Sequence, residues 1–311
     1  MKISEILDFL RADGCPFSFS GDPKGAAEGF SSLTQYKPGS FTWIKTQKNI
    51  PEGLDLSRLA LVFAAEGVGV GDAPNVIRSP ESKRAFFSTI EHFYAQEEER
   101  PTIGQFTYLS PKVKLGKNVR IGHNCTLDGD IIIGDGTVIW NNVVIINRVA
   151  IGKDCDSVVG KAGGFVSCDI HSGVIIGHNG FAYTENAEHQ KTMVKHFGGV
   201  IIGDQVLVGE NVCISRGTID DTVVESGVKI DALSHIAHNC IYRKNAVAAA
   251  PCRTNGSVIV GENAYLAGAL VRNQCTIGVN AFVGLGAVVV RDVPPGATVV
   301  GNPAKPFRGK E

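Results

Sequence analysis

The chain has 311 residues, of which 43% are hydrophobic and 20% are charged, with a formal net charge of −1. This length leaves room for two domains and a sizeable core. The balanced charge argues against a nucleic-acid binder, because no basic block is present to neutralise phosphates. The sequence also predicts no signal peptide and no membrane span, since it has neither a cationic start before an apolar run nor a long apolar stretch.

Residues 1–100 lack any repeat and predict a small α/β domain. Apolar residues at helical spacing near the start predict a first helix. The segments FTWI (41–44) and LALVFA (59–64) predict strands. Ser79 and the proline after it predict the cap and the first position of a second helix over 80–94.

From residue 101 to residue 293 an aliphatic residue recurs at intervals of six, with some interruptions. The clearest members are Leu115, Ile121, Leu127, Ile133, Ile139, Ile145, Ile151, Ile202, Val208, Ile214, Val224, Ile230 and Ile236. Neither a helix nor a strand has this period. It predicts a solenoid in which six residues make one short face, three faces close a coil of 18, and stacked coils bury the aliphatic column.

Three segments interrupt this pattern. The register is lost over 156–173, to which we assign no role. The polar stretch 184–196 predicts a loop thrown out from a coil corner, where solenoids tend to carry function. The tail 294–311 contains Pro294, Pro295 and Pro303, and we expect these prolines to stop the regular core.

The chain has eight cysteines and no CxxC pair. Four of them fall in the small-residue slot of the repeat, where a buried thiol packs like a small hydrophobe: Cys125, Cys155, Cys240 and Cys252. Free, buried thiols are typical of a reducing compartment, so we expect a cytoplasmic protein.

Three histidines occupy the same slot, two positions after the aliphatic residue: His123, His178 and His238. A solvent-facing corner that tolerates His explains His123 better than a function does, and for His178 the two interpretations are balanced. His238 has distinctive surroundings. Asp231 lies seven residues earlier, where it could orient an imidazole, and Gly256 lies 18 residues later, one full coil along. A base beside a free backbone N–H suits acyl transfer, because the base takes a proton from the nucleophile and the N–H stabilises the oxyanion.

The six-residue pattern resembles the hexapeptide-repeat family, which implies a left-handed parallel β-helix. The motifs GHNGFAYTEN, GGVIIGD, SRGTIDDTVV, GVKID and IAHN, with GFSSLTQYKPGSFTWI in the first domain, resemble the UDP-3-O-acylglucosamine N-acyltransferase family of lipid A synthesis. The resemblance implies that His238 is the general base, that Asp231 assists it, and that Gly256 supplies an oxyanion N–H. It also implies a homotrimer with active sites between neighbouring solenoids.

The sequence departs from that family in three places. The segment 272–277 lacks the family's second active-site His. Only Trp43 remains as a stacking ring of the uracil-binding box, because Thr46 and Asn49 occupy its other positions. The tail resembles that of CoA-dependent sugar acetyltransferases and lacks the helices that engage acyl-carrier protein.

Other candidates are balanced against simpler interpretations. Trp43 could stack on a nucleotide or belong to a core. Phe181 and Tyr183 could line a sugar site with His178, or pack at a corner. Asn186 and His196 are expected in a solvated loop. Lys305 and Arg308 could pair with donor phosphates or be solvated.

We therefore expect an N-acyltransferase that moves an acyl group from a thioester to the amine of a nucleotide-linked amino sugar, with acyl-CoA as the favoured donor. The alternative is an acyl-carrier-protein-dependent N-acyltransferase of lipid A synthesis. We expect no metal, because no two histidines have the five-residue spacing of the zinc carbonic anhydrases of this fold. A non-catalytic scaffold would present a regular exposed array, which the segment 184–196 interrupts.

Overall fold

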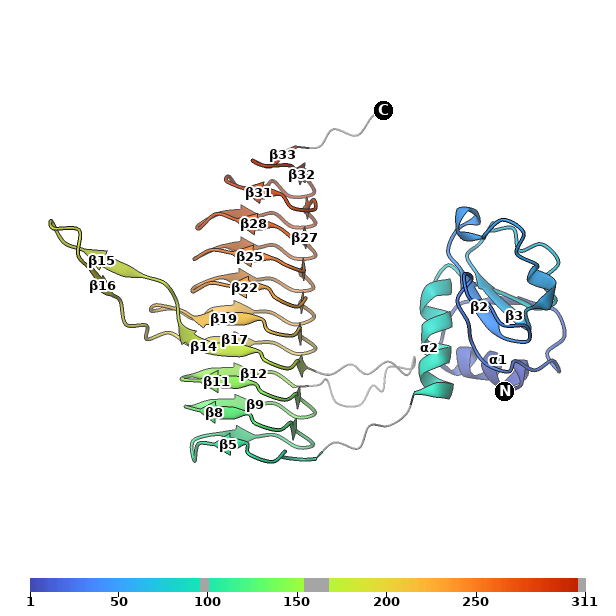
Figure 1. Ribbon diagram of the computed structural model, residues 1–311, viewed down its shortest axis with the longest axis horizontal. Coiled ribbons are helices and arrows are strands. Elements are labelled where there is room, and N and C mark those ends of the chain that lie inside the picture. Colours follow the sequence, from blue (N-terminus) through green and yellow to red (C-terminus); the bar gives the residue numbers. More distant parts are fainter. Residues whose placement is uncertain (96–100, 154–167, 307–311) are drawn as a thin grey trace. The chain divides into compact units, whose positions relative to one another are not determined.

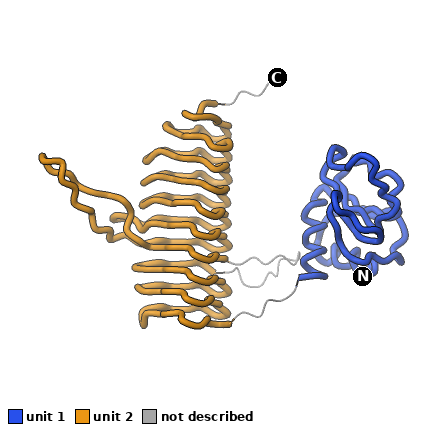
Figure 2. Tube along the Cα trace, in the orientation of Figure 1, with its two compact units in different colours: residues 1–98, 157–165 blue, residues 99–156, 166–311 orange. Residues whose placement is uncertain are grey.

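The computed structural model describes residues 1–95, 101–153 and 168–306, and the chain divides into two compact units (Figure 2). Residues 1–95 form the described part of the α/β unit. Residues 101–153 and 168–306 form the described part of the β-helix. Within these ranges neither α-helix is long and apolar enough to cross a lipid bilayer.

The α/β unit is a four-stranded sheet with two α-helices and two short 3-10 helices. The strands lie in the order β1 (Ser18–Ser20), β4 (Val76–Arg78), β3 (Leu61–Ala64), β2 (Phe41–Ile44), and the helices are α1 (Ile3–Ala12), η1 (Gln47–Asn49), η2 (Leu56–Arg58) and α2 (Ser82–Tyr94). The predicted apolar face of α1 is confirmed, because Ile3, Ile6, Leu7 and Leu10 are buried in the core of this unit.

The helix predicted over 80–94 begins two residues later, at Ser82. Ser79 still continues the sheet, since its N–H donates to the carbonyl of Ala64. Its hydroxyl accepts from the N–H of Glu81 at 3.0 Å, so Ser79 closes a turn before the helix and does not cap it.

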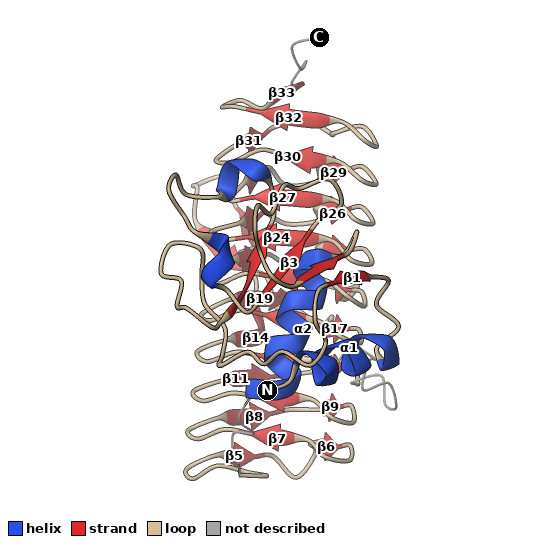
Figure 3. Cartoon of the chain, turned by 90° about the vertical axis from the view of Figure 1, so that its right-hand side faces the viewer, coloured by secondary structure: helices blue, strands red, loops and turns tan. Residues whose placement is uncertain are grey.

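The β-helix stacks its strands into three ladders, one on each face of the coil, and they are parallel except for the last pair of the first face (Figures 1 and 3). The first face holds β7 (Arg120–Ile121), β10 (Val138–Ile139), β13 (Asp169–Ile170), β18 (Leu207–Val208), β21 (Lys229–Ile230), β24 (Val247–Ala249), β27 (Tyr265–Ala267), β30 (Phe282–Val283), β32 (Thr298–Val300) and β33 (Lys305–Pro306). The second face holds β5 (Tyr108–Leu109), β8 (Thr126–Asp128), β11 (Val144–Ile146), β14 (Ile175–Asn179), β19 (Cys213–Arg216), β22 (His235–Ile236), β25 (Arg253–Thr254), β28 (Leu270–Val271) and β31 (Val288–Val289). The third face holds β6 (Lys114–Leu115), β9 (Ile131–Ile133), β12 (Val149–Ile151), β17 (Val200–Ile202), β20 (Thr222–Val224), β23 (Ile241–Tyr242), β26 (Ile259–Val260) and β29 (Thr276–Ile277).

The register confirms the coil of 18 residues, because Ile121 pairs with Ile139 and Ile236 pairs with Thr254. The aliphatic column forms the core: Ile121, Ile139 and Ile236 are each at most 1% exposed. Each such side chain contributes about 1.5–3 kcal/mol through burial. The core therefore fixes which residues face inward and which are left at the corners for chemistry.

Asparagine recurs at the corners because the backbone there adopts a left-handed conformation. Asn118, Asn124, Asn142 and Asn239 have φ between 55° and 61°. Asn tolerates this region better than most residues. The corners therefore hold their neighbouring side chains in a fixed direction.

The excursion predicted over 184–196 is confirmed, but it is largely an antiparallel hairpin, β15 (Tyr183–Glu185) and β16 (Lys191–Met193), which extends from the solenoid in Figure 1. The prediction for the tail is wrong, because β32 pairs in parallel with β30 and so continues the core. Pro294 and Pro295 lie at the corner before β32, so they take no ladder position. Most of 156–173 lies outside the described residues, and the register resumes at β13.

Candidate functional site

His238 lies at the corner that follows β22, where the second face turns into the third. Its ring is partly exposed, and its Nδ1 lies 3.0 Å from Oδ1 of Asn239. The direction of that contact depends on the orientation of the Asn239 amide. Nearby residues of the same chain fix this orientation.

The insertion between β19 and β20 orients Asn239. The N–H and hydroxyl of Thr218 donate to Oδ1 at 3.1 and 2.9 Å, while Nδ2 donates to the carbonyl of Asp220 at 3.0 Å. A backbone N–H can only donate, so Oδ1 is an acceptor and Nδ1 of His238 carries the hydrogen. The remaining ring nitrogen, Nε2, is left as the basic atom.

Gly256 lies directly against that basic atom, as the coil spacing predicts. A β-carbon at Gly256 would be 2.7 Å from both Cε1 and Nε2 of His238. Only glycine permits this approach without moving the ring. The Gly256 N–H has no acceptor among the hydrogen bonds of the described residues. The basic atom of His238 therefore adjoins a residue whose backbone donor is unused.

We expected Asp231 to orient His238, but among the hydrogen bonds of the described residues Asp231 makes none to that ring. It lies one corner earlier, after β21, and is exposed. Its two carboxylate oxygens accept from the N–H groups of Ala232 and Ala250 at 2.8 and 3.1 Å. Seven residues carry the chain past β22, so Asp231 and His238 lie at consecutive corners of the coil. Asn239 occupies the orienting position instead.

Two further histidines, His178 and His196, lie near His238. His178 belongs to β14, and its Nε2 is 3.4 Å from the hydroxyl of Ser215. His196 was expected in a solvated loop but is 1% exposed, and its ring lies perpendicular to that of His238 with centroids 5.6 Å apart. Burial lowers the pKa of His196, and the nearby His238, Arg216 and His178 lower it further. The ring of His196 is therefore neutral near pH 7.

His123 has a structural role, as its position in the repeat predicts. Its Nδ1 accepts from the N–H of Gln105 at 2.8 Å, which ties it to the preceding coil. Its own N–H donates to Oδ1 of Asn141 in the following coil at 2.7 Å.

Phe181 and Tyr183 lie on the hairpin arm, with ring centroids 5.6 Å apart, and they are 79% and 42% exposed. The polar tip includes Asn186, which accepts from the backbone of Glu188 and Gln190. Lys305 lies in β33 and is exposed, whereas Arg308 lies outside the described residues.

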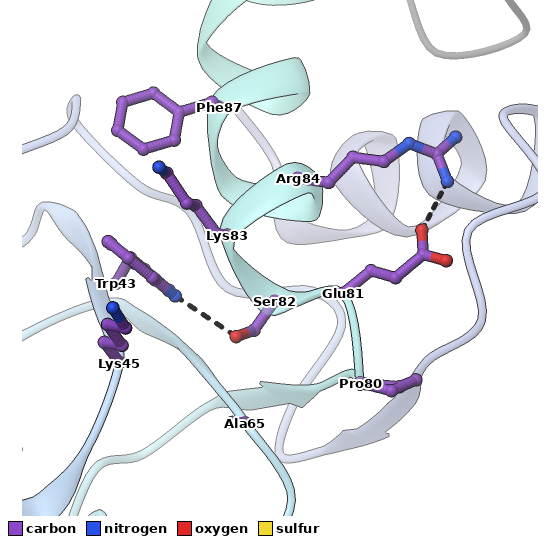
Figure 4. A pocket seen from close by; sticks show the side chains of 9 residues that line it. All are labelled: Trp43, Lys45, Ala65, Pro80, Glu81, Ser82, Lys83, Arg84 and Phe87. Carbon is purple, nitrogen blue, oxygen red and sulfur yellow. Dashed lines mark hydrogen bonds and ion pairs between the residues drawn. The ribbon is translucent and has the colours of Figure 1, made fainter. Parts of the chain in front are cut away.

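Trp43 lines a pocket of about 680 Å³ in the α/β unit (Figure 4). Its Nε1 donates to the hydroxyl of Ser82 at 3.1 Å, and its ring contacts Phe87 edge-on. Lys45, directly after β2, and Lys83, in the first turn of α2, also line this pocket. The lining also includes Glu81 and Arg84, which pair with each other. The aromatic face, the two lysines and the helix N-terminus form a surface suited to a base and an anion. The sequence singled out Trp43 but not the two lysines.

No family model matches the chain, but individual relatives do. It is 38% identical over 140 residues to UDP-3-O-acylglucosamine N-acyltransferase from Caulobacter sp. (strain K31), a stretch that covers 45% of this chain and 41% of that protein. It is 40% identical over 141 residues to the protein of the same name from Methylorubrum populi, covering 45% of the chain and 40% of the relative. The chain thus spans about two fifths of the length of the relatives that it matches.

Solved structures share the fold. A UDP-N-acetylglucosamine acyltransferase from Bacteroides fragilis aligns with a TM-score of 0.55 at 24% identity, over 65% of this chain and 72% of that one. LpxA from Acinetobacter baumannii aligns with a TM-score of 0.53 at 22% identity, over 67% and 74%. The architecture is therefore the parallel β-helix of these acyltransferases, and part of the sequence is similar to that of UDP-3-O-acylglucosamine N-acyltransferases.

Proposed function

We propose that the protein is an N-acyltransferase that moves an acyl group from a thioester to the amine of a UDP-linked amino sugar. The observation that carries this proposal is the close approach of the His238 ring to Gly256, whose N–H has no acceptor among the described residues and can donate to a substrate oxygen. The names of the relatives support UDP-3-O-acylglucosamine as the acceptor. That favours the lipid A alternative over transfer to other surface sugars.

The proposed reaction needs one base and one oxyanion donor. The amine nitrogen attacks the thioester carbonyl carbon, a C–N bond forms, and the carbonyl electron pair moves to oxygen. The Gly256 N–H donates to that oxyanion while Nε2 of His238 takes a proton from nitrogen. When the carbonyl re-forms, the C–S bond breaks and the thiolate takes the proton from His238.

Asn239 supports both stages of this reaction. Because its Oδ1 accepts from Nδ1 of His238, the ring presents Nε2 as the base and the resulting imidazolium keeps a partner. We assign to Asn239 the orienting role that the resemblance gave to Asp231.

We further propose that Trp43 stacks on the nucleobase of the acceptor, with Lys45 and Lys83 near its phosphates. The pocket in Figure 4 supports this assignment, since these three side chains line it together. Titration with UDP should quench tryptophan fluorescence. Trp43→Leu should remove the quench, whereas Trp140→Phe should keep it.

Phe181, Tyr183 and His178 are proposed sugar contacts, and Lys305 and Arg308 are proposed donor contacts. We also propose a cytoplasmic homotrimer. The seven described cysteines are free, which suits a reducing compartment. Phe181, Phe197 and Ile219 are 79%, 67% and 80% exposed, which suits a surface covered by another copy. Light scattering should give three times the 33.0 kDa of one chain.

The direct experiment incubates the purified protein with UDP-3-O-acylglucosamine and a thioester, and measures the amide product by mass spectrometry. Acyl-carrier protein and CoA thioesters of matched chain length run in parallel, which identifies the donor. Amide formation with either donor supports the proposal. A complete absence of amide with both donors, across UDP-, dTDP- and GDP-amino sugars, would refute it.

A further inference from the structure

Both ends of the hairpin arm meet at His238. The arm leaves the solenoid at Gly180 and returns at His196. A β-carbon at Gly180 would lie 2.8 Å from Cδ2 and 2.9 Å from Cβ of His238, and 3.0 Å from Nε2 of His196. Cδ2 of His238 and Nε2 of His196 thus border the same small space, on the side of the His238 ring away from Gly256.

The ring of His196 is held as one defined tautomer. Its Nδ1 lies 2.9 Å from the carbonyl oxygen of Val194, and a carbonyl only accepts, so Nδ1 carries the hydrogen. Nε2 therefore presents a lone pair. That atom is buried and finds no hydrogen-bond partner among the residues that the structure describes.

A buried acceptor without a partner is unfavourable for folding. A phenyl ring is planar like imidazole and one ring atom larger, and it carries no acceptor that burial would leave unpaired. Packing alone therefore does not account for a histidine at position 196. The His238 ring packs perpendicular to the His196 ring, with centroids 5.6 Å apart.

We propose that His196 is a positioning residue for His238, in the acyl transfer proposed above on which this inference rests. Its lone pair faces the electropositive edge of the His238 ring, and that edge becomes more positive when His238 accepts the amine proton. His196 holds the ring with Nε2 toward Gly256 and stabilises the imidazolium. It acts through His238 and touches neither substrate.

Steady-state kinetics of two variants test this role. His196→Phe keeps a ring but removes the lone pair, so kcat should fall about 10-fold to 100-fold with KM nearly unchanged. His196→Gln can place an amide oxygen near the position of Nε2, and it should recover most of kcat. The control His189→Gln, at the exposed tip of the same arm, should stay within about twofold of wild type.

The same variants separate positioning from packing. His196→Phe should melt at or above the temperature of the wild type, since it removes an unpaired buried acceptor. An unchanged kcat in His196→Phe, an equal loss in His196→Gln, or a large fall in melting temperature would each overturn the proposal.

A second measurement does not depend on turnover. Long-range ¹H–¹⁵N spectra of the imidazole rings report which nitrogen carries the hydrogen. In the wild type both His196 and His238 should carry it on Nδ1, and His196→Phe should perturb the His238 signals strongly. Unchanged His238 signals would refute the inference. Absence of acyl transfer in the wild type would instead refute the proposed function. The His238 signals would still show whether His196 positions the His238 ring.

Discussion

The corners at His123 and His238 have nearly the same sequence, IGHN and IAHN, but different surroundings. At His123 the next coil presents Asn141, whose side chain accepts the His123 N–H, and the imidazole accepts from Gln105. At His238 the next coil presents Gly256, which leaves space beside the ring and an N–H free among the described contacts. The IxHN motif alone therefore does not define the site. The site depends on Gly256, one coil later, because glycine has no side chain to occupy the space beside His238.

Replacing the base should have the largest effect. His238→Ala removes the proposed proton acceptor, and acyl transfer should fall about 100-fold to 10,000-fold. His123→Ala is the matched control and should keep near wild-type turnover, although it loses some stability. Rates are measured by amide formation under saturating substrates. Equal losses in the two variants would erase the distinction between the corners.

Filling the space at Gly256 should have the next largest effect. Gly256→Ala places a β-carbon 2.7 Å from Nε2 of His238, so the ring must move away from the oxyanion donor. We expect a loss of about 100-fold or more in kcat. The melting temperature should change little, because a partly exposed side chain can swing aside. A variant with full activity would show that the close approach is irrelevant.

The orienting amide can be removed while the backbone is kept. Asn239 has φ of 61°, which glycine adopts freely, so Asn239→Gly deletes the partner of Nδ1 without straining the corner. A freed imidazole should cost about 10-fold to 100-fold in kcat. Asn124→Gly, at the corner of His123 with φ of 55°, is the matched control. The prediction fails if both variants retain wild-type kcat.

The smallest effect concerns pH. Burial holds the pKa of His196 below its ordinary value of about 6.5, so between the two values the unfolded chain binds more protons than the folded one. Folding stability should therefore fall as pH drops below about 6.5.

Urea unfolding at pH 7.5 and pH 5.5 measures this dependence. The wild type should lose more stability between the two values than His196→Phe does. Burial also lowers the pKa of His235, so the variant should keep part of the dependence. Identical dependence in the two proteins would contradict the assignment.

The sequence predicts much of this architecture because a solenoid is governed by local spacing. A period of six places Ile121, Ile139 and Ile236 in the core, and a spacing of 18 places Gly256 beside His238. The same reasoning fails at Asp231, because seven residues include a full face and a corner that spacing alone does not orient.

Contacts between residues that are far apart in the chain are also not predicted by the repeat pattern. His196 lies in a polar stretch, and its burial arises only because the arm returns to the solenoid beside Gly180. Asn239 stands beside His238 in the chain, but its orientation depends on Thr218 and Asp220 in the insertion. No periodicity reports those contacts.

The central claim is that His238 and Gly256 act on the same carbonyl group. A crystal structure with the bound amide product or a tetrahedral analogue tests it most directly. The account predicts that the acyl oxygen accepts from the Gly256 N–H within about 3 Å, and that the transferred nitrogen lies within hydrogen-bond reach of Nε2 of His238. An acyl oxygen bound elsewhere, with the Gly256 N–H facing solvent, would contradict it.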